Sequence, residues 1–189
     1  MVQAELLDDV RRLFPTRRAP HSTRIGVEQE HLALDTRTGG VVPIDRIRPA
    51  VAGLPVAFEP GGQVELNLPP VAASRLATTY AAAAAGLQRA SRSVGVRLET
   101  TPLDHRDVPL QLRTPRYLAM QAHFDTIGPA GRRMMRRTAG TQVCLDWWPG
   151  RAGLEQWRLL LLAGPLLAAA LNRSDRLATW LAVDPARTG

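Results

Sequence analysis

The ten residues from Phe58 to Asn67, FEPGGQVELN, are the most informative stretch of this sequence. Pro60 restricts its own backbone, and the two glycines that follow it reach backbone angles closed to other residues, so a turn is predicted here. After the turn, polar and apolar residues alternate, which predicts a strand with two different faces. The polar face carries Gln63, Glu65 and Asn67, and the apolar face carries Val64, Leu66 and Leu68.

A second strand of the same character is predicted from Ile25 to Leu34, IGVEQEHLAL. Glu28 and Glu30 are two residues apart, so their side chains leave the same face, with Cα atoms about 6.6 Å apart. Leu32 and Leu34 continue that face. Carboxylates beside an apolar stripe are costly unless a cation or hydrogen-bond donors compensate them.

The two segments together offer four carboxylates, at Glu28, Glu30, Glu59 and Glu65. Oxygen ligands of this kind suit hard divalent cations such as Mg²⁺. The alternative is that all four are ordinary surface residues on half-exposed strands, because carboxylates are mostly exposed in proteins.

The chain of 189 residues is long enough for one domain with its own core, and we expect residues 1–189 to form a single domain. A hydrophobic content of 45% predicts a globular protein. The net charge is +7, every basic residue is arginine, and the lack of lysine excludes a P-loop lysine or a Schiff base. No nucleic-acid-binding motif accompanies the arginines, so we expect a nucleotide or an acidic small molecule as the ligand and no nucleic acid.

The only cysteine, Cys144, excludes an internal disulfide and a cysteine-based metal site, and it is expected to be a small buried side chain. Met1 leads into acidic and polar residues, which does not resemble a signal peptide. The longest apolar stretch, Leu159 to Leu171, is short for a membrane span and is interrupted by Gly164-Pro165. We therefore expect a cytoplasmic protein with no membrane contact.

The pattern of the remaining chain predicts helices and strands in alternation. Helices are expected at Val2–Phe14, Ala72–Ser93, Pro115–Ile127, Ala130–Arg137 and, buried, at Gly153–Leu171. Further strands are expected at Val94–Thr100 and Thr141–Trp147, the Glu65 strand is expected to end at Pro69-Pro70, and no clear element is expected in Asn172–Gly189. This order predicts an α+β fold, an antiparallel sheet with helices packed on one side.

A third group of residues completes a recognisable pattern. It consists of Thr114-Pro115-Arg116-Tyr117, then Gly128, Gly131, Met134-Met135 and finally Gln142-Val143-Cys144-Leu145-Asp146. With the Gly26–Glu30 and Glu59–Leu66 segments, this ordered set resembles the glutamate–cysteine ligases. The similarity is to the plant and proteobacterial type and to the actinobacterial branch of the ergothioneine pathway. It covers Gly26 to Asp146 and continues, more weakly, to Asp184–Gly189.

The resemblance implies a glutamine-synthetase-like catalytic fold, present in part, and an ATP-dependent enzyme that forms gamma-glutamylcysteine through an acyl phosphate. Such chemistry depends on positioning and on metal ions that neutralise phosphate charge. By resemblance, Glu28, Glu30, Glu59 and Glu65 bind Mg²⁺ or Mn²⁺, and Glu28, Glu30 and Glu65 are catalytic. The residues implied in binding glutamate, cysteine or ATP are Gln63, Asn67, Arg116, Tyr117 and Gln142.

The sequence also departs from the family pattern. Cys144 stands where the family has asparagine, and Asn67 where it usually has serine, which leaves the amine acceptor open. The family's enzymes are about twice as long, and the resemblance is to their N-terminal half. Two alternatives therefore stay open: a carboxylate–amine ligase with another acceptor, or a non-catalytic fragment that binds metal or substrate. An open sheet edge is expected, which predicts pairing with a C-terminal-half subunit or with a second copy.

Overall fold

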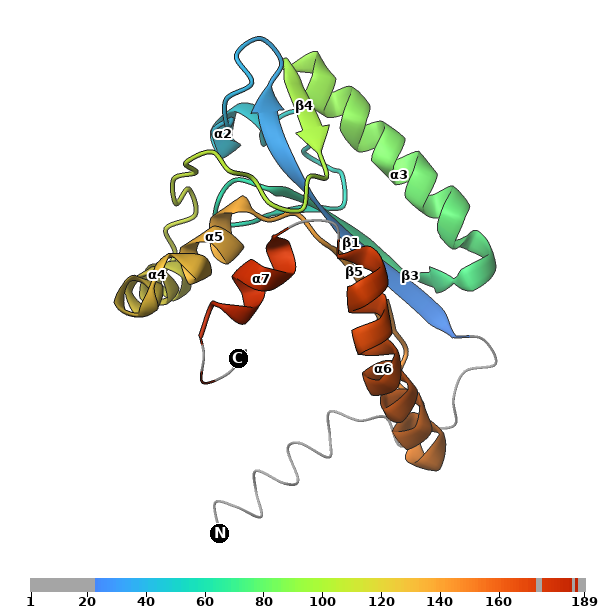
Figure 1. Cartoon of the computed structure of the whole chain (residues 1–189). Helices are drawn as coiled ribbons and strands as arrows, with labels where there is room; N and C mark the ends of the chain where they lie inside the picture. Colours follow the sequence, from blue (N-terminus) through green and yellow to red (C-terminus); the bar gives the residue numbers. More distant parts are fainter. Residues whose placement is uncertain (1–22, 173–174, 185, 187–189) are drawn as a thin grey trace.

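The structure is a computed structural model that describes residues 23–172, 175–184 and 186 (Figure 1). The predicted helix Val2–Phe14 lies outside the described residues. The elements in chain order are β1 (Arg24–Asp35), α2 (Ile44–Ile47), β2 (Val56–Phe58), β3 (Val64–Ala72), α3 (Ala73–Ser93), β4 (Val96–Glu99), α4 (Pro115–Ile127), α5 (Pro129–Arg137), β5 (Thr141–Leu145), α6 (Gly150–Leu171) and α7 (Arg176–Leu181).

The strands form one antiparallel five-stranded sheet with β1 at its centre. Along one edge of β1 lies β3, which in turn pairs with the short strand β2. The other edge of β1 is shared by two strands: β5 pairs with Ile25–Gln29 and β4 pairs with Leu32–Asp35. The α+β class and the antiparallel sheet are therefore confirmed.

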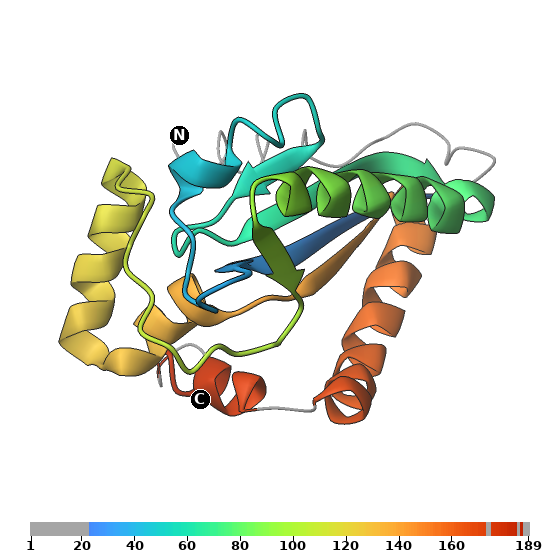
Figure 2. The same cartoon turned by 90° about the horizontal axis from the view of Figure 1, so that it is seen from above.

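The core lies between this sheet and α3. Val64 and Leu66 are completely buried and Leu68 is 4% exposed, as their alternation predicts. They pack with Leu87 of α3 and Val96 of β4 in one apolar cluster. Figure 2 shows α3 lying along this face of the sheet, whereas α5 and α7 lie on the opposite side. The helix α5 contacts both α4 and α7. The expectation that the helices pack on one side of the sheet is therefore wrong, because α3 covers the core face and α5 and α7 lie on the other side.

The end expected for the Glu65 strand is wrong, because β3 continues through Pro69-Pro70 to Ala72. The pairing with β1 shifts register between Ile25 and Val27, and resumes with Ile25 opposite Val71. Since β2 pairs only with Val64–Leu66, the prolines face no ladder partner on that edge. A proline, which lacks a backbone N–H, is tolerated at such an irregular, edge-like position.

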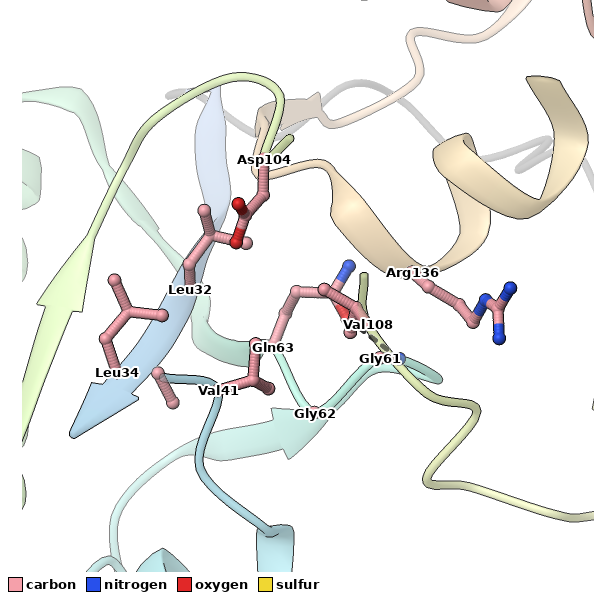
Figure 3. Close-up of a pocket in the computed structure, with 10 residues that line it drawn as sticks. Leu32, Leu34, Val41, Gly61, Gly62, Gln63, Asp104, Val108 and Arg136 are labelled. Atoms are coloured by element: carbon pink, nitrogen blue, oxygen red, sulfur yellow. Dashed lines mark hydrogen bonds between the residues drawn. The ribbon is translucent and has the colours of Figure 1, made fainter. Parts of the chain in front are cut away.

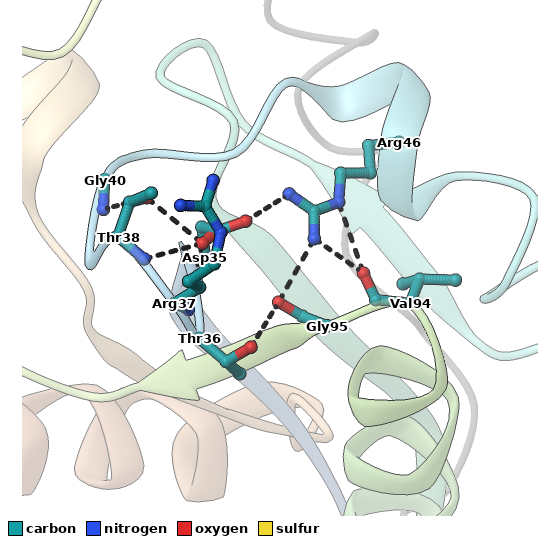
Figure 4. Close-up of polar contacts among 8 residues, drawn as sticks. All are labelled: Asp35, Thr36, Arg37, Thr38, Gly40, Arg46, Val94 and Gly95. Carbon is teal, nitrogen blue, oxygen red and sulfur yellow. Dashed lines mark hydrogen bonds and ion pairs between the residues drawn. The ribbon is translucent and has the colours of Figure 1, made fainter.

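A polar cluster closes the far end of the sheet (Figure 4). Asp35 Oδ1 accepts hydrogen bonds from the backbone nitrogen of Thr38 at 2.7 Å and from that of Arg37 at 2.9 Å. Asp35 also pairs with Arg46, which donates to the carbonyl of Val94 at 2.9 Å. The Arg46 guanidinium holds the pKa of Asp35 well below its usual range. This cluster joins the end of β1 to α2 and to the turn between α3 and β4.

The C-terminal part differs from expectation in three respects. α6 is not buried: Gly153 is its only buried residue, and the helix continues through Pro165 without interruption. α7 forms within the segment expected to have no clear element. Cys144 is exposed, because β5 is an outer strand whose five residues are all exposed. Apolar composition states which side chains gain from burial, but burial also requires an element to pack on them.

Within the described residues, α6 is the one helix long and apolar enough to cross a membrane, with a mean hydropathy of 1.3 over its most apolar window. The expectation that this stretch is too short applies to the apolar run and not to the 22-residue helix. A single helix of this kind is weak evidence for a span, because core helices and signal sequences meet the same criteria.

Candidate active site

The predicted carboxylates converge on the face of the sheet opposite the core. Glu30 of β1 lies directly opposite Glu65 of β3, and Glu28 lies opposite Asn67. Paired residues of antiparallel strands project to the same side of the sheet. The turn brings Glu59 to that side as well, since its backbone nitrogen bonds to the carbonyl of Gln63 at 2.9 Å, in continuation of the β2–β3 ladder.

The outer strand β5 extends this acidic face. Gln142 lies opposite Glu28, and Cys144 lies opposite Gly26. Glu28 is therefore flanked by two amides, Asn67 on β3 and Gln142 on β5. Both residues predicted to bind substrate or nucleotide on these strands thus lie beside a predicted metal ligand.

The carboxylates are close enough to shift one another's titration. Burial, followed by the negative charges of Glu65 and Glu30, raises the pKa of Glu59 to about 7, against the opposing charge of Arg116. Burial also raises the pKa of Glu65, helped by the charges of Glu28 and Glu30. Glu30, Glu59 and Glu65 therefore form an electrostatic cluster of raised pKa values, and the charge of Glu28 contributes to the rise in all three.

A cavity of about 210 Å³ opens beside this cluster, at the start of α4. Thr114 caps that helix, with the backbone nitrogen of Tyr117 donating to its Oγ1 at 3.4 Å. The Arg116 guanidinium lies 5.6 Å from the centre of the Tyr117 ring. Burial and the nearby charge of Glu59 raise the pKa of Tyr117. The cavity is lined by Glu30, Glu59, Arg116, Tyr117, Met120 and Met134, among others.

The turn that carries Glu59 is held by Gln63, which is 3% exposed. Gln63 accepts a hydrogen bond from the backbone nitrogen of Gly61 at 2.9 Å and donates to the carbonyl of Thr138 at 3.0 Å. Gly61 lies against α5 so closely that a Cβ atom there would be 2.1 Å from the carbonyl oxygen of Arg136 (Figure 3). These contacts give Gln63 a structural role, while its predicted role in ligand binding stays a prediction.

The small cavity behind this turn is not a ligand site. Its volume is about 10 Å³, which is about the space of one water molecule. Figure 3 shows Gln63 and Gly61 at its edge, with the apolar side chains of Leu32 and Leu34 on β1. It is a packing gap between the turn, β1 and the end of α5.

Arg176 is a site residue that the sequence did not single out. A guanidinium nitrogen of Arg176 lies 3.0 Å from the position that a Cβ on Gly140 would take, and Glu30 Oε2 lies 3.5 Å from the same position. Burial raises the pKa of Glu30, while the hydrogen bond from the Gly140 nitrogen at 2.7 Å and the charge of Arg176 oppose that rise. The only available signal was a lone arginine in a polar segment, which is not specific.

The donor set of this face fits a hard divalent cation in its chemistry, because it offers carboxylate and amide oxygens. The crowding of negative charge, which adds to burial in raising the pKa of Glu59, is also what such a cation would relieve. In the part of the chain that the structure describes, however, no three His, Cys, Asp or Glu side chains are arranged tightly enough to hold a metal ion. The metal-ligand roles of Glu28, Glu30, Glu59 and Glu65 therefore stay predictions.

Comparison with known proteins agrees with the resemblance. The chain is 33% identical over 163 residues to glutamate–cysteine ligase EgtA of Mycolicibacterium smegmatis, a match that covers 76% of this chain and 38% of that protein. It is also 33% identical over 164 residues to EgtA of Mycobacterium tuberculosis, covering 77% of this chain and 38% of the relative. The chain thus spans less than half the length of these relatives.

The model of glutamate-cysteine ligase family 2 matches residues 24–188, which include every strand of the sheet and all four clustered carboxylates. Because this match covers most of the sequence, the chain belongs to glutamate-cysteine ligase family 2.

Proposed function

We propose that this chain provides the acidic part of an ATP-dependent ligase that joins the side-chain carboxylate of glutamate to the amino group of cysteine. The observation that carries the proposal is the convergence of Glu28, Glu30, Glu59 and Glu65 on one face of the sheet. The relatives bear the name glutamate–cysteine ligase, which supports this choice of reaction. A cytoplasmic enzyme of ergothioneine biosynthesis is the setting that we propose for it.

In the proposed reaction, the glutamate side-chain carboxylate takes the γ-phosphoryl group of ATP, and ADP leaves. The amine of cysteine then attacks the acyl carbon, phosphate leaves, and the amine loses a proton. Bound Mg²⁺ or Mn²⁺ supplies neutralisation of phosphate charge. Glu28, Glu30, Glu59 and Glu65 would hold the metal, and the first two with Glu65 are the residues that we expect the reaction to need most.

The cavity beside the carboxylates suits glutamate. Arg116 lines it and lies close enough to Glu59 for its charge to oppose the rise in the pKa of that carboxyl. An arginine in this position binds a substrate carboxylate by a forked pair of hydrogen bonds. Tyr117 lines the same cavity and would contact the substrate. On the open strands, Asn67 and Gln142 flank Glu28 and would orient phosphate oxygens.

A second candidate is a related ligase that uses another amine as acceptor. It is favoured by the exposed thiol of Cys144, which lies on the acidic face where the family pattern has asparagine. A changed side chain on that face would alter which acceptor fits. A third candidate, a non-catalytic fragment that binds metal or substrate, predicts metal binding without turnover.

The test is a coupled assay of ADP release by this chain together with the part of the M. smegmatis relative that follows the aligned segment, with glutamate and a panel of amines, and with the product identified by mass. The proposal expects ADP release that requires glutamate, cysteine and Mg²⁺, and that disappears in Glu65→Gln. Asp45→Asn, which removes an exposed carboxylate on α2, is the matched control and should keep full activity. Faster turnover with a different amine would favour the second candidate. A stabilising shift with Mg²⁺ and no ADP release with any amine would favour the third.

A further inference from the structure

One surface of the molecule is strongly apolar and uncovered. Nine large apolar side chains of α6 are between 49% and 73% exposed: Leu154, Trp157, Leu159, Leu160, Leu161, Leu162, Leu166, Leu167 and Leu171. On β5, Val143 is 61% and Leu145 is 40% exposed. Monomeric soluble proteins rarely leave so many neighbouring apolar side chains in water. We refer to the outer edge of β5 with α6 as the α6–β5 surface.

The two elements are joined and form a continuous surface. Gln156 of α6 donates to the carbonyl of Asp146 at 2.9 Å, and its Oε1 accepts from the backbone nitrogen of Trp148 at 3.2 Å. The rings of Trp147 and Trp157 meet edge to face, with centres 6.4 Å apart. A mainly apolar cavity of about 570 Å³ lies between the end of β5 and α6, and it is lined by Leu145, Trp148, Leu159 and Leu160, among others.

The edge of the sheet is open along the same surface. β5 pairs with β1 on one side, and in the described part of the chain it pairs with no strand on the other. An open edge presents unpaired backbone N–H and C=O groups that an added strand can satisfy. Lipid offers no hydrogen-bond partners for such groups, so the combination of edge and apolar helix fits a protein and not a bilayer.

We propose that the α6–β5 surface binds the remaining part of the ligase domain, adding a strand beside β5 and covering α6. This inference rests on the proposed function. The relatives align with this chain over 38% of their length, within their N-terminal half, so most of each relative lies beyond the matched segment. In the relatives, the segment outside the match is therefore long enough to cover the surface that corresponds to the α6–β5 surface.

The inference gives the partner a place in the active site. Gln142 and Cys144 lie on the acidic face of β5, at the last strand before the open edge. A strand added there would place its own side chains next to these two, on the face that carries the carboxylates. The site would then be closed by residues that the partner supplies.

The test is co-expression of this chain with the part of the M. smegmatis relative that follows the aligned segment, so that neither has to fold alone. We expect a one-to-one complex by size-exclusion chromatography with light scattering. Amide hydrogen exchange in Thr141–Leu145 and in α6 should slow at least tenfold on complex formation. The double variant Leu160→Asp/Leu166→Asp should lower the yield of complex at least tenfold. The control Leu118→Asp, at an exposed leucine on α4, should leave that yield unchanged.

Several outcomes would overturn the inference. They are no complex, a complex with unchanged exchange in β5 and α6, a homodimer that alone protects β5, or binding of the chain to phosphatidylglycerol vesicles that Leu160→Asp abolishes. The assay of ADP release separates this inference from the proposed function. A protected complex without turnover would support the surface and refute the ligase activity. Turnover without protection of β5 would do the reverse.

Discussion

The carboxyl group of Glu59 should destabilise the folded chain when it ionises. Burial and the charges of Glu65 and Glu30 raise its pKa from an ordinary 4.5 to about 7. The folded state therefore keeps a proton that the unfolded state has already lost between these two values. Stability from this group is full below pH 4.5 and is lost as the pH rises through 7.

The size of the effect follows from the shift. A rise of that extent corresponds to about 3 kcal/mol between the charged and neutral forms. Because Glu59 is only half-buried, solvent screening reduces the expected effect to about 1–2 kcal/mol. Glu59→Gln keeps the shape and removes the charge, so it should stabilise the metal-free protein by about 1–2 kcal/mol at pH 8. At pH 4.5 the same substitution should have almost no effect.

The assay is urea denaturation of both proteins at the two pH values in EDTA, with the free energy of unfolding taken from each curve. Glu155→Gln, which removes an exposed carboxylate on α6, controls for a general charge effect and should show no such dependence on pH. A gain of equal size at pH 4.5 and pH 8, or a loss at pH 8, would refute the reasoning. Millimolar Mg²⁺ should cancel the greater stability of Glu59→Gln, because the ion can bind the carboxylate of Glu59 in the native protein and the variant lacks that ligand.

Three further predictions concern the same face of the sheet. Mg²⁺ should raise the melting temperature of the native chain, by an amount equivalent to about 2.7 kcal/mol at a hundred times the dissociation constant, and Glu65→Gln should abolish the rise seen by scanning fluorimetry. Gly61→Ala should lower the unfolding free energy by about 1–3 kcal/mol, because its Cβ would meet the Arg136 carbonyl at 2.1 Å. Gly86→Ala on α3, whose Cβ would make only an ordinary contact with the Leu54 side chain at 3.9 Å, should instead be neutral or stabilising in the same urea titration. Arg176→Gln should raise the pKa of Glu30, since it removes an opposing charge, and a carboxyl titration by carbon NMR that shows a lower pKa would contradict this assignment.

The acidic face was predictable because it depends on a local property. Alternation with a period of two assigns each side chain of a strand to one face, whatever the strand pairs with. It therefore assigned Glu65 and Leu66 to different faces of their strand, and Glu28 and Glu30 to the same face, as the structure has them. The direct pairing of Glu30 with Glu65 is a matter of register between distant segments, and neither segment states it alone.

The failures concern properties that a segment does not contain. The apolar sequence of α6 predicted burial, but the described residues supply no layer that covers it. The strand β3 continues through Pro69-Pro70 because a register shift in its pairing with β1 lies opposite the two prolines. The sequence around the prolines does not indicate such a shift. Arg176 was overlooked because α7 is a six-residue helix in a polar segment. Arg176 is relevant to the site only because the fold brings it close to Glu30.

The central position of β1 has a consequence for how the protein is made. Glu28 gains its second neighbouring strand only when Gln142 arrives, more than a hundred positions later in the chain. A ribosome must therefore release most of this polypeptide before the acidic face is complete. Until then the Ile25–Gln29 part of β1 has an unpaired edge that other nascent chains can pair with, which makes aggregation during synthesis a hazard for this protein. Slower expression at low temperature should accordingly increase the soluble yield.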